Sequence, residues 1–281
     1  MICKRILPSP ELSNFIKEYL TMHLVFDDAS IIPPPKAYPV NPEEGIRFLV
    51  RGTLFSENPE AGITEKRPTI TIFGQPNSRQ NLYVSHEYLM FHIRFQPGGL
   101  FKLLGIPMDE LVHQNIDAVL ILGREVKEVQ EQLEESKCYD AMLRILNNYF
   151  LKKIRQLKES NRPIDKIGQM ILVNPQSFNL EKTAREACLS HRQFEKRFRM
   201  QIGITPKYYA RICRFYQAYE LKEYKPHLDW LRVAMETGYN DYQHLVKDFK
   251  QFAGTTPNAL IKESLNNPER RFNISDKFRG V

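Results

Sequence analysis

Residues 183–206, TAREACLSHRQFEKRFRMQIGITP, and residues 233–257, VAMETGYNDYQHLVKDFKQFAGTTP, follow one pattern of residue types. Six positions recur with the same spacing, 51 residues apart. In the first copy they are Ser190, Phe194, Phe198, Gly203, Thr205 and Pro206, and in the second Asp241, Leu245, Phe249, Gly254, Thr256 and Pro257. A repeat of this kind indicates one supersecondary unit built twice.

Each position in the pattern has a physical role in a helix. Ser190 and Asp241 are N-cap residues, whose side chains accept backbone N–H bonds at a helix start. The apolar residues one and two turns later define the buried face. A glycine then ends the helix in the left-handed conformation, and Thr-Pro starts the next one. Short amphipathic helices precede both copies, at 180–189 and 228–239, and Trp230 is expected to pack within the second. Each unit therefore reads as a helix-turn-helix.

The predicted second helix of each unit carries a polar stripe opposite its buried face. In the first unit the stripe is Arg192, Glu195, Lys196 and Arg199, and in the second Tyr242, Gln243, Val246, Lys247 and Lys250. A solvated surface is the ordinary explanation of one such stripe. However, residues 161–281 hold 21 basic against 13 acidic residues, whereas residues 1–160 hold 19 against 20. Two stripes in the half that carries the whole positive excess favour a polyanionic partner.

The carboxyl-terminal half resembles the DNA-binding domain of the AraC/XylS-type transcriptional regulators. The resemblance spans residues 164–262 and includes the two units and the segment RICRFYQAYELK (211–222) between them. It implies seven helices in two helix-turn-helix units, joined by a long helix over about residues 206–224. It also implies that each recognition helix enters the major groove of double-stranded DNA. Cys188 stands where the family usually has glycine, and Thr183 stands at an aliphatic core position, whereas the second unit keeps Gly238.

The stripe residues then divide into two predicted roles. Lys and Arg read guanine, so Arg192, Lys196 and Lys247 are base-contact candidates, with Glu195 for cytosine and Gln243 for adenine. Tyr242 and Val246 would contact a thymine methyl group. The predicted phosphate contacts, which position the protein without reading sequence, are Arg199, Lys207, Arg211 and Lys250.

The first half of the chain is predicted to be rich in strands. Short β-type runs occupy residues 19–26, 46–50, 69–73, 81–84 and 88–95, separated by turn clusters such as SENPEAG (56–62). This spacing predicts an antiparallel sandwich or small barrel. The segment RFQPGGLFKLLGIPMDEL (94–111) resembles uncharacterised domains that often precede this DNA-binding module. The family then implies a cupin-like sensor domain with helices behind it, and a multi-domain α+β chain overall.

Helices are expected after residue 97. Two short ones are predicted within 100–105 and 108–112, and two longer ones over 124–135 and 139–158. The last carries apolar residues on more than one side, which leaves two alternatives: packing within its own domain, or a homodimer seam through residues 124–158. The predicted boundaries are a sensor or oligomerisation domain (1–158), a linker (159–163), the DNA-binding domain (164–265) and a basic tail (266–281). The tail is expected to be either unstructured or in contact with phosphates.

Composition narrows the class of protein. No apolar run approaches the ~18 residues of a membrane span, and the amino terminus lacks a secretory signal, so a cytoplasmic, bacterial-type regulator is expected. No cofactor or metal is expected, and His92 is interpreted as an ordinary sheet residue. Cys188 and Cys213 are expected to be packed on helices. The expected partner is double-stranded DNA. Control of DNA binding by a small-molecule effector of unknown identity, control by dimerisation through the first half, and constitutive binding with no effector remain the alternatives.

The protein is predicted not to be an enzyme. The alternative is a metal-dependent cupin-like or DNA-modifying enzyme that the basic half targets to DNA. A DNA-modifying version would need a reactive cysteine in the first half, where only Cys3 and Cys138 occur.

Overall fold

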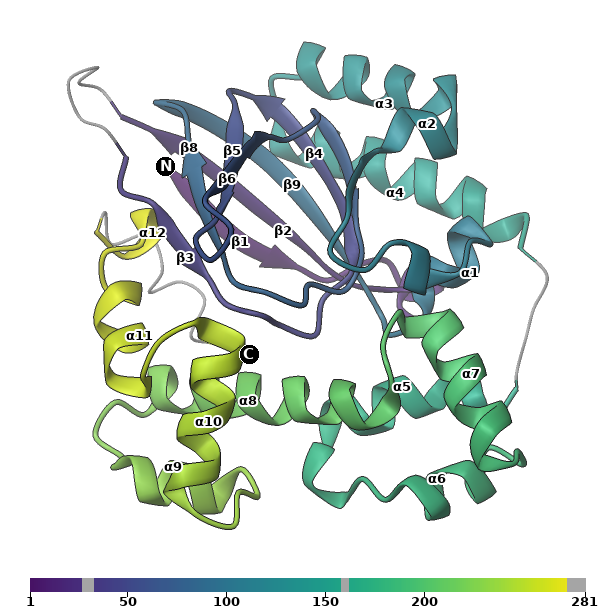
Figure 1. Ribbon diagram of the computed structural model, residues 1–281. Coiled ribbons are helices and arrows are strands. Elements are labelled where there is room, and N and C mark those ends of the chain that lie inside the picture. Colours follow the sequence, from purple (N-terminus) through teal and green to yellow (C-terminus); the bar gives the residue numbers. More distant parts are fainter. Residues whose placement is uncertain (27–32, 158–161, 272–281) are drawn as a thin grey trace.

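The computed structural model describes residues 1–26, 33–157 and 162–271. Its first half contains two antiparallel sheets (Figure 1). The larger sheet has the strand order β1 (Ile2–Ile6), β2 (Ile16–Val25), β9 (Glu87–Phe95), β4 (Gly45–Arg51), β7 (Ile70–Phe73) and β10 (Asn115–Asp117). The smaller sheet has the order β3 (Lys36–Tyr38), β8 (Gln80–Val84), β5 (Leu54–Asn58) and β6 (Ile63–Lys66).

Successive side chains of a strand point to opposite faces of the sheet, and both faces of the larger sheet are covered. On β2, Leu20, Met22 and Leu24 belong to an apolar cluster with Leu54 of the smaller sheet. The alternate residue Tyr19 belongs to a second cluster with the helices on the other face. The larger sheet is therefore the central layer of the first half.

The five predicted strands are confirmed, because each carries the alternating or continuous apolar pattern that identifies a strand. Five further strands had no such signal. They are β1, β3, β5, β6 and β10. The SENPEAG cluster was predicted as a turn, but β5 extends into it, and its Ser56 is only 2% exposed.

Helices cover the outer face of the larger sheet. They are α1 (Gly99–Leu104), α2 (Ala118–Leu122), α3 (Arg124–Glu135) and α4 (Tyr139–Arg155), with a short 3-10 helix at Met108–Glu110. The predicted apolar face of α3 is buried, and its remaining surface is charged and exposed. On α4, Met142, Leu146, Tyr149 and Phe150 are buried in the core of the first half.

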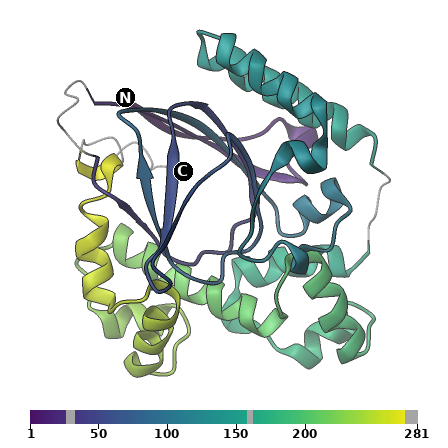
Figure 2. The ribbon, with the colours of Figure 1, turned by 45° about the horizontal axis from the view of Figure 1, so that its top comes forward.

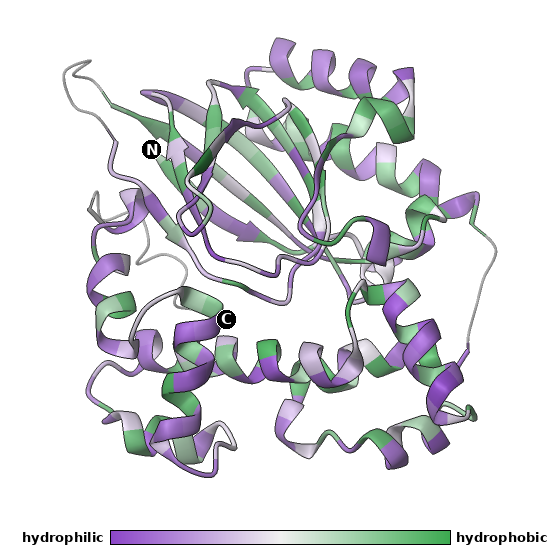
Figure 3. Cartoon of the chain, in the orientation of Figure 1, coloured by the Kyte–Doolittle hydropathy of each residue, from purple (hydrophilic) through white to green (hydrophobic). Residues whose placement is uncertain are grey.

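The second half is helical. Its helices are α5 (Ile164–Val173), α6 (Leu180–Glu186), α7 (His191–Ile202), α8 (Pro206–Tyr224), α9 (Trp230–Glu236), α10 (Tyr242–Ala253), α11 (Pro257–Ser264) and α12 (Pro268–Arg271). The long central helix α8 has the predicted bounds. The Trp230 ring packs edge-on against Phe249, 5.2 Å between centroids, as expected. Figure 3 shows hydrophobic residues along the strands and many hydrophilic residues on α7 and α10.

Two predicted segments fall mainly outside the described residues. Residues 159–161 of the expected linker and 272–281 of the basic tail are among them. The described start of the tail forms α12, where Glu269 pairs with Lys36 of β3 and Arg270 pairs with Glu223 of α8. That part of the tail is therefore held by the body of the protein.

The two halves share an interface along one side of the sandwich, and both views show it (Figures 1 and 2). Val40 follows β3 but belongs to the apolar core of the helical half, and its N–H donates to the carbonyl oxygen of Phe252 at 2.9 Å. A Cβ on Gly203 would lie 2.8 Å from Val112 Cγ2, so the end of α7 also rests on the first half.

The described part of the chain holds neither a candidate membrane-spanning helix nor a candidate metal site. None of its helices has the length and apolarity that crossing a bilayer requires. Its His, Cys, Asp and Glu side chains form no group of three or more that could hold a metal ion. His92 lies on β9 with its ring edge-on to Phe73, where burial lowers its pKa.

Candidate nucleic-acid interface

The helices α7 and α10 begin with the caps that the repeat predicts. The Ser190 hydroxyl accepts from the N–H of Gln193, which reaches back to Ser190 in a full capping box. The Asp241 carboxylate accepts from the N–H of His244 at 2.8 Å, and this bond lowers the pKa of Asp241. Both helices end at a glycine with positive φ, 95° at Gly203 and 64° at Gly254. The two helices are therefore started and stopped by the same chemistry.

The turn inside each unit has a left-handed residue. Gly238 has φ of 77° in the second unit, and Cys188 has φ of 55° at the matching place in the first. Cys188 is exposed. The expectation that it packs on a helix is wrong, because the turn rotates its side chain outward. Cys213, on α8, is buried as expected.

The exposed face of α7 is basic and unpaired. Phe194 and Phe198 are 0% and 1% exposed. Lys196 lies opposite them, with Arg192 and Arg199 beside it along the axis, and all three side chains are exposed. None of the three appears in an ion pair among the described residues. Glu195 is half-buried, at the border of this face.

The face of α10 is similar in form. Leu245 and Phe249 are fully buried, and Gln243, Lys247 and Lys250 are exposed on the opposite side. Tyr242 is 37% exposed and Val246 half-buried, and both lie to one side. Sequence reasoning overlooked three further exposed residues beside these stripes: His191, Arg197 and His244.

The amino-terminal ends of α7 and α10 lie on the same side of the protein, away from the sheets (Figure 1). Their carboxyl-terminal ends face the first half. The Arg79 guanidinium donates to the carbonyl oxygen of Ala253 at 3.1 Å and pairs with Glu263 at 2.7 Å, which holds the end of α10. A polyanion could therefore reach both helix starts without meeting the sheets.

The two predicted phosphate contacts on α8 are placed differently. Lys207 is exposed at the start of α8. Arg211 is half-buried, and its guanidinium pairs with Asp248 at 2.6 Å. Asp248 also accepts from the hydroxyl of Tyr239 at 3.0 Å. Burial, together with this carboxylate, raises the pKa of Tyr239, so its hydroxyl keeps the proton it donates.

Family models match both halves of the chain. Residues 183–263 match a model described as a helix-turn-helix domain, and residues 4–117 match a domain of unknown function, DUF6597. No curated protein matches the chain.

Three solved structures match the chain, each with a TM-score below 0.5. ToxT from Vibrio cholerae O395 is 11% identical, with 89% of this chain and 98% of that chain covered and a TM-score of 0.46. The DNA-binding domain of AdpA in complex with a target DNA is 22% identical, covering 43% of this chain and all of that one, with a TM-score of 0.33. The AraC-like transcriptional activator CuxR is 12% identical, covering 78% and 87% of the two chains, with a TM-score of 0.26.

The helix-turn-helix match contains both copies of the repeat, with their caps, buried faces and terminal glycines. The residues that carry the AraC/XylS resemblance thus form the two units that it implies. Residues 183–263 thus form an AraC-type helix-turn-helix domain behind a DUF6597 domain at residues 4–117, and the chain is a DNA-binding transcription regulator.

Proposed function

We propose that α7 and α10 read two major-groove segments on one face of a DNA duplex. The observation that carries this proposal is the pair of capped helices whose starts lie on one side of the protein and whose lysine and arginine side chains make no ion pair with any described residue. A recognition helix uses its amino-terminal part for base edges. Arg192, Glu195 and Lys196 on α7 are accordingly base contacts, as are Tyr242, Gln243, Val246 and Lys247 on α10.

The phosphate contacts of this proposal are Arg199, Lys207 and Lys250, which stand further along the helices or at the start of α8. Arg197 joins them, because it is exposed beside Lys196. Arg211 is assigned a structural role, since its guanidinium already neutralises the buried carboxylate of Asp248.

The first half serves as a sensor rather than a catalyst in this proposal. Its Cys3 is buried, and burial raises the pKa of that thiol to about 12, so the nucleophilic thiolate is absent at neutral pH. An effector would bind in the cavity of about 290 Å³ between the sheets and α8. The protein acts in the cytoplasm, where DNA is accessible.

Packing within the chain is favoured over a homodimer seam at residues 124–158. The buried residues of α4 already contact their own sheet and α3, and α3 presents only charged or polar side chains outward. A single sedimenting species of dimer mass at tens of micromolar would reverse this preference.

The test separates base reading from phosphate contact on α7. Sites bound by the full chain are first selected from random duplex DNA, and single-base variants of the best site are then measured. Lys196→Ala is expected to cost about 1–3 kcal/mol on the best site and to relax preference at one base pair. Arg199→Ala should weaken all sequences about equally and lower the salt slope by roughly 1.

Lys196→Ala and Arg199→Ala should leave stability unchanged, since neither residue makes a core contact. Phe198→Ala provides the contrast: it empties a buried site and should cost about 3–5 kcal/mol of folding free energy. An even loss of affinity across the panel for Lys196→Ala would show that Lys196 contacts a phosphate. Absence of binding to any selected duplex would overturn the proposal.

A further inference from the structure

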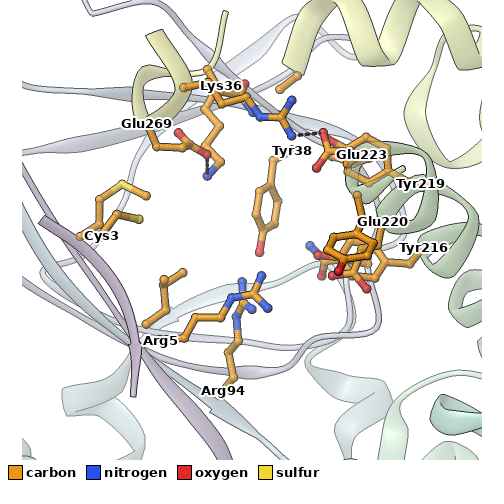
Figure 4. A pocket seen from close by; sticks show the side chains of 18 residues that line it. Cys3, Arg5, Lys36, Tyr38, Arg94, Tyr216, Tyr219, Glu220, Glu223 and Glu269 are labelled. Atoms are coloured by element: carbon orange, nitrogen blue, oxygen red, sulfur yellow. Dashed lines mark hydrogen bonds and ion pairs between the residues drawn. The ribbon is translucent and has the colours of Figure 1, made fainter. Parts of the chain in front are cut away.

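A cavity of about 290 Å³ lies between the two halves (Figure 4). One wall is formed by β1, β2 and β3, with Cys3 and Lys36 among its residues, and the other by α8 and α12. Figure 4 shows Tyr38 projecting into the space and Glu220 and Tyr216 on the side of α8. Its volume suits a ligand of small-metabolite size.

Three of the basic groups that line the cavity are already paired. Lys36 pairs with Glu269, and Arg270 pairs with Glu223. Arg94 contacts two carboxylates, Glu18 at 2.7 Å and Glu43 at 3.1 Å. Arg5, the fourth basic group, also makes contacts of its own.

One carboxylate has no such partner. Glu220 lines the cavity, and it makes no hydrogen bond or ion pair with any residue in the described ranges. Lys17 and Arg5 are near enough to act on it only at longer range. Desolvation by the surrounding protein outweighs them and raises the pKa of Glu220, although this residue is still exposed to solvent, so its charged form is less favoured here than in water. A cation beside the carboxylate would remove that penalty.

The remaining unused hydrogen-bonding atoms are mostly acceptors. Asn41 Oδ1 and Asn267 Oδ1 accept from no donor among the described residues, although these residues are only 2% and 5% exposed. Glu269 Oε2 lacks a donor too. Within the described part of the lining, the one buried donor without an acceptor is Arg94 Nε, on a guanidinium that is already paired twice. Buried polar groups are normally satisfied, so a ligand that donates hydrogen bonds is what these atoms lack.

Aromatic rings complete the lining. Tyr38, Tyr216, Tyr219 and Tyr224 all contribute to it. The faces of such rings attract cations when the site is desolvated. An unpaired carboxylate, orphaned acceptors and several tyrosine rings are complementary to one kind of molecule.

Building on the proposed function, we propose that the effector is a small organic amine, bound as its cation. Its ammonium group lies beside Glu220 and donates to Asn41 and Asn267, and its carbon skeleton packs against the tyrosines. Because β3 and α8 both contact it, the amine bridges the sensor half and the helix that joins the two DNA-reading units.

The test uses thermal unfolding of the full chain with four amines: phenethylamine, cadaverine, spermidine and choline. Phenylacetate and benzyl alcohol are the anionic and neutral controls for phenethylamine. At about 100-fold excess over its Kd, an amine should raise Tm by roughly 5–10 °C. The two controls should leave Tm unchanged. Glu220→Gln keeps the shape of the side chain and should lower the amine affinity at least about tenfold.

Glu131→Gln is the matched control, because it removes an exposed carboxylate of α3 far from the cavity and should bind amines like the natural chain. Stabilisation by phenylacetate alone, no shift with any amine at about 10 mM, or full amine binding by Glu220→Gln would each overturn the amine assignment. DNA binding is measured in parallel. Amine binding without DNA binding would defeat the proposed function and leave the amine site standing.

Discussion

Cys188 and Gly238 occupy the same left-handed turn of the two units, and only one of them is suited to it. A side chain with a Cβ costs roughly 1–2 kcal/mol in this conformation, whereas glycine adopts it freely. Because Cys188 replaces the glycine of the family pattern, the turn of the first unit is strained. The family resemblance locates this departure in the sequence, whereas the 51-residue spacing of the repeat would align Cys188 with Tyr239.

We expect Cys188→Gly to stabilise the protein by about 1 kcal/mol, since the relief of strain exceeds the extra entropy of glycine in the unfolded chain. The converse change, Gly238→Ala, should destabilise it, because the new Cβ would also lie 2.5 Å from Gln176 Cβ. Urea denaturation of the two variants measures both effects. A less stable Cys188→Gly would mean that the thiol makes a contact worth more than the strain.

Glu44 is a buried acid at the start of α1. Its carboxylate accepts from the N–H of Gly98 at 3.1 Å, and burial raises its pKa to about 8. The folded state therefore holds a proton that the unfolded state, with the ordinary value of 4.5, releases. The resulting stabilisation is complete below pH 4.5 and is lost as pH rises through about 8.

We expect the free energy of unfolding to fall by about 2 kcal/mol between pH 6.5 and 8.5. Glu44→Gln should remove this slope, because the amide oxygen still accepts from Gly98 but does not titrate. The lowered pKa of His92 affects stability mainly below pH 6.5, and there it makes stability rise with pH. Equal slopes in the natural chain and Glu44→Gln would assign the titration to another group.

The helices α7, α8 and α10 show what a sequence pattern can and cannot locate. Their bounds follow from N-caps, glycines and Thr-Pro pairs, which act within one turn of the chain. The ion pair of Arg211 shows what such patterns cannot locate, because its partner Asp248 is 37 residues away on α10. Likewise, β3 and β10 have only three residues each, too few for a period of two to appear.

We expect Arg211→Ala to lower the free energy of unfolding by about 1–3 kcal/mol, because it strips a hydrogen-bonded partner from a buried carboxylate. The salt slope of DNA binding should not change. Lys207→Ala should do the reverse, leaving stability intact and lowering the slope by roughly 1. A reduced slope for Arg211→Ala would restore it as a phosphate contact.

The contact between the two halves lies beyond any pattern in the sequence. Arg79 lies within the turn cluster GQPNSRQ (74–80), and nothing near it in the chain indicates that it caps α10, which ends 174 residues later. The cavity is equally hidden from sequence patterns, because strands at the start of the chain and helices near its end form its walls. Only the folded arrangement brings these surfaces together.

We expect Arg79→Ala to loosen the second unit from the sheets by about 1–2 kcal/mol. Hydrogen exchange should then quicken roughly 5–30-fold at the carboxyl-terminal end of α10 and in α11, with little change in α6. Exchange that quickens equally throughout the helical half would indicate general destabilisation rather than local undocking.

Val40 has a consequence for how such regulators can be recombined. Its side chain is 0% exposed and completes the core of the helical half, although it belongs to the other half of the sequence. A chimera that joins residues 162–271 to a foreign sensor would leave that place unfilled and the carbonyl of Phe252 without its donor. The helical half therefore cannot be exchanged between regulators by itself. A chimera that folds must include the segment around Val40 together with the DNA-reading helices.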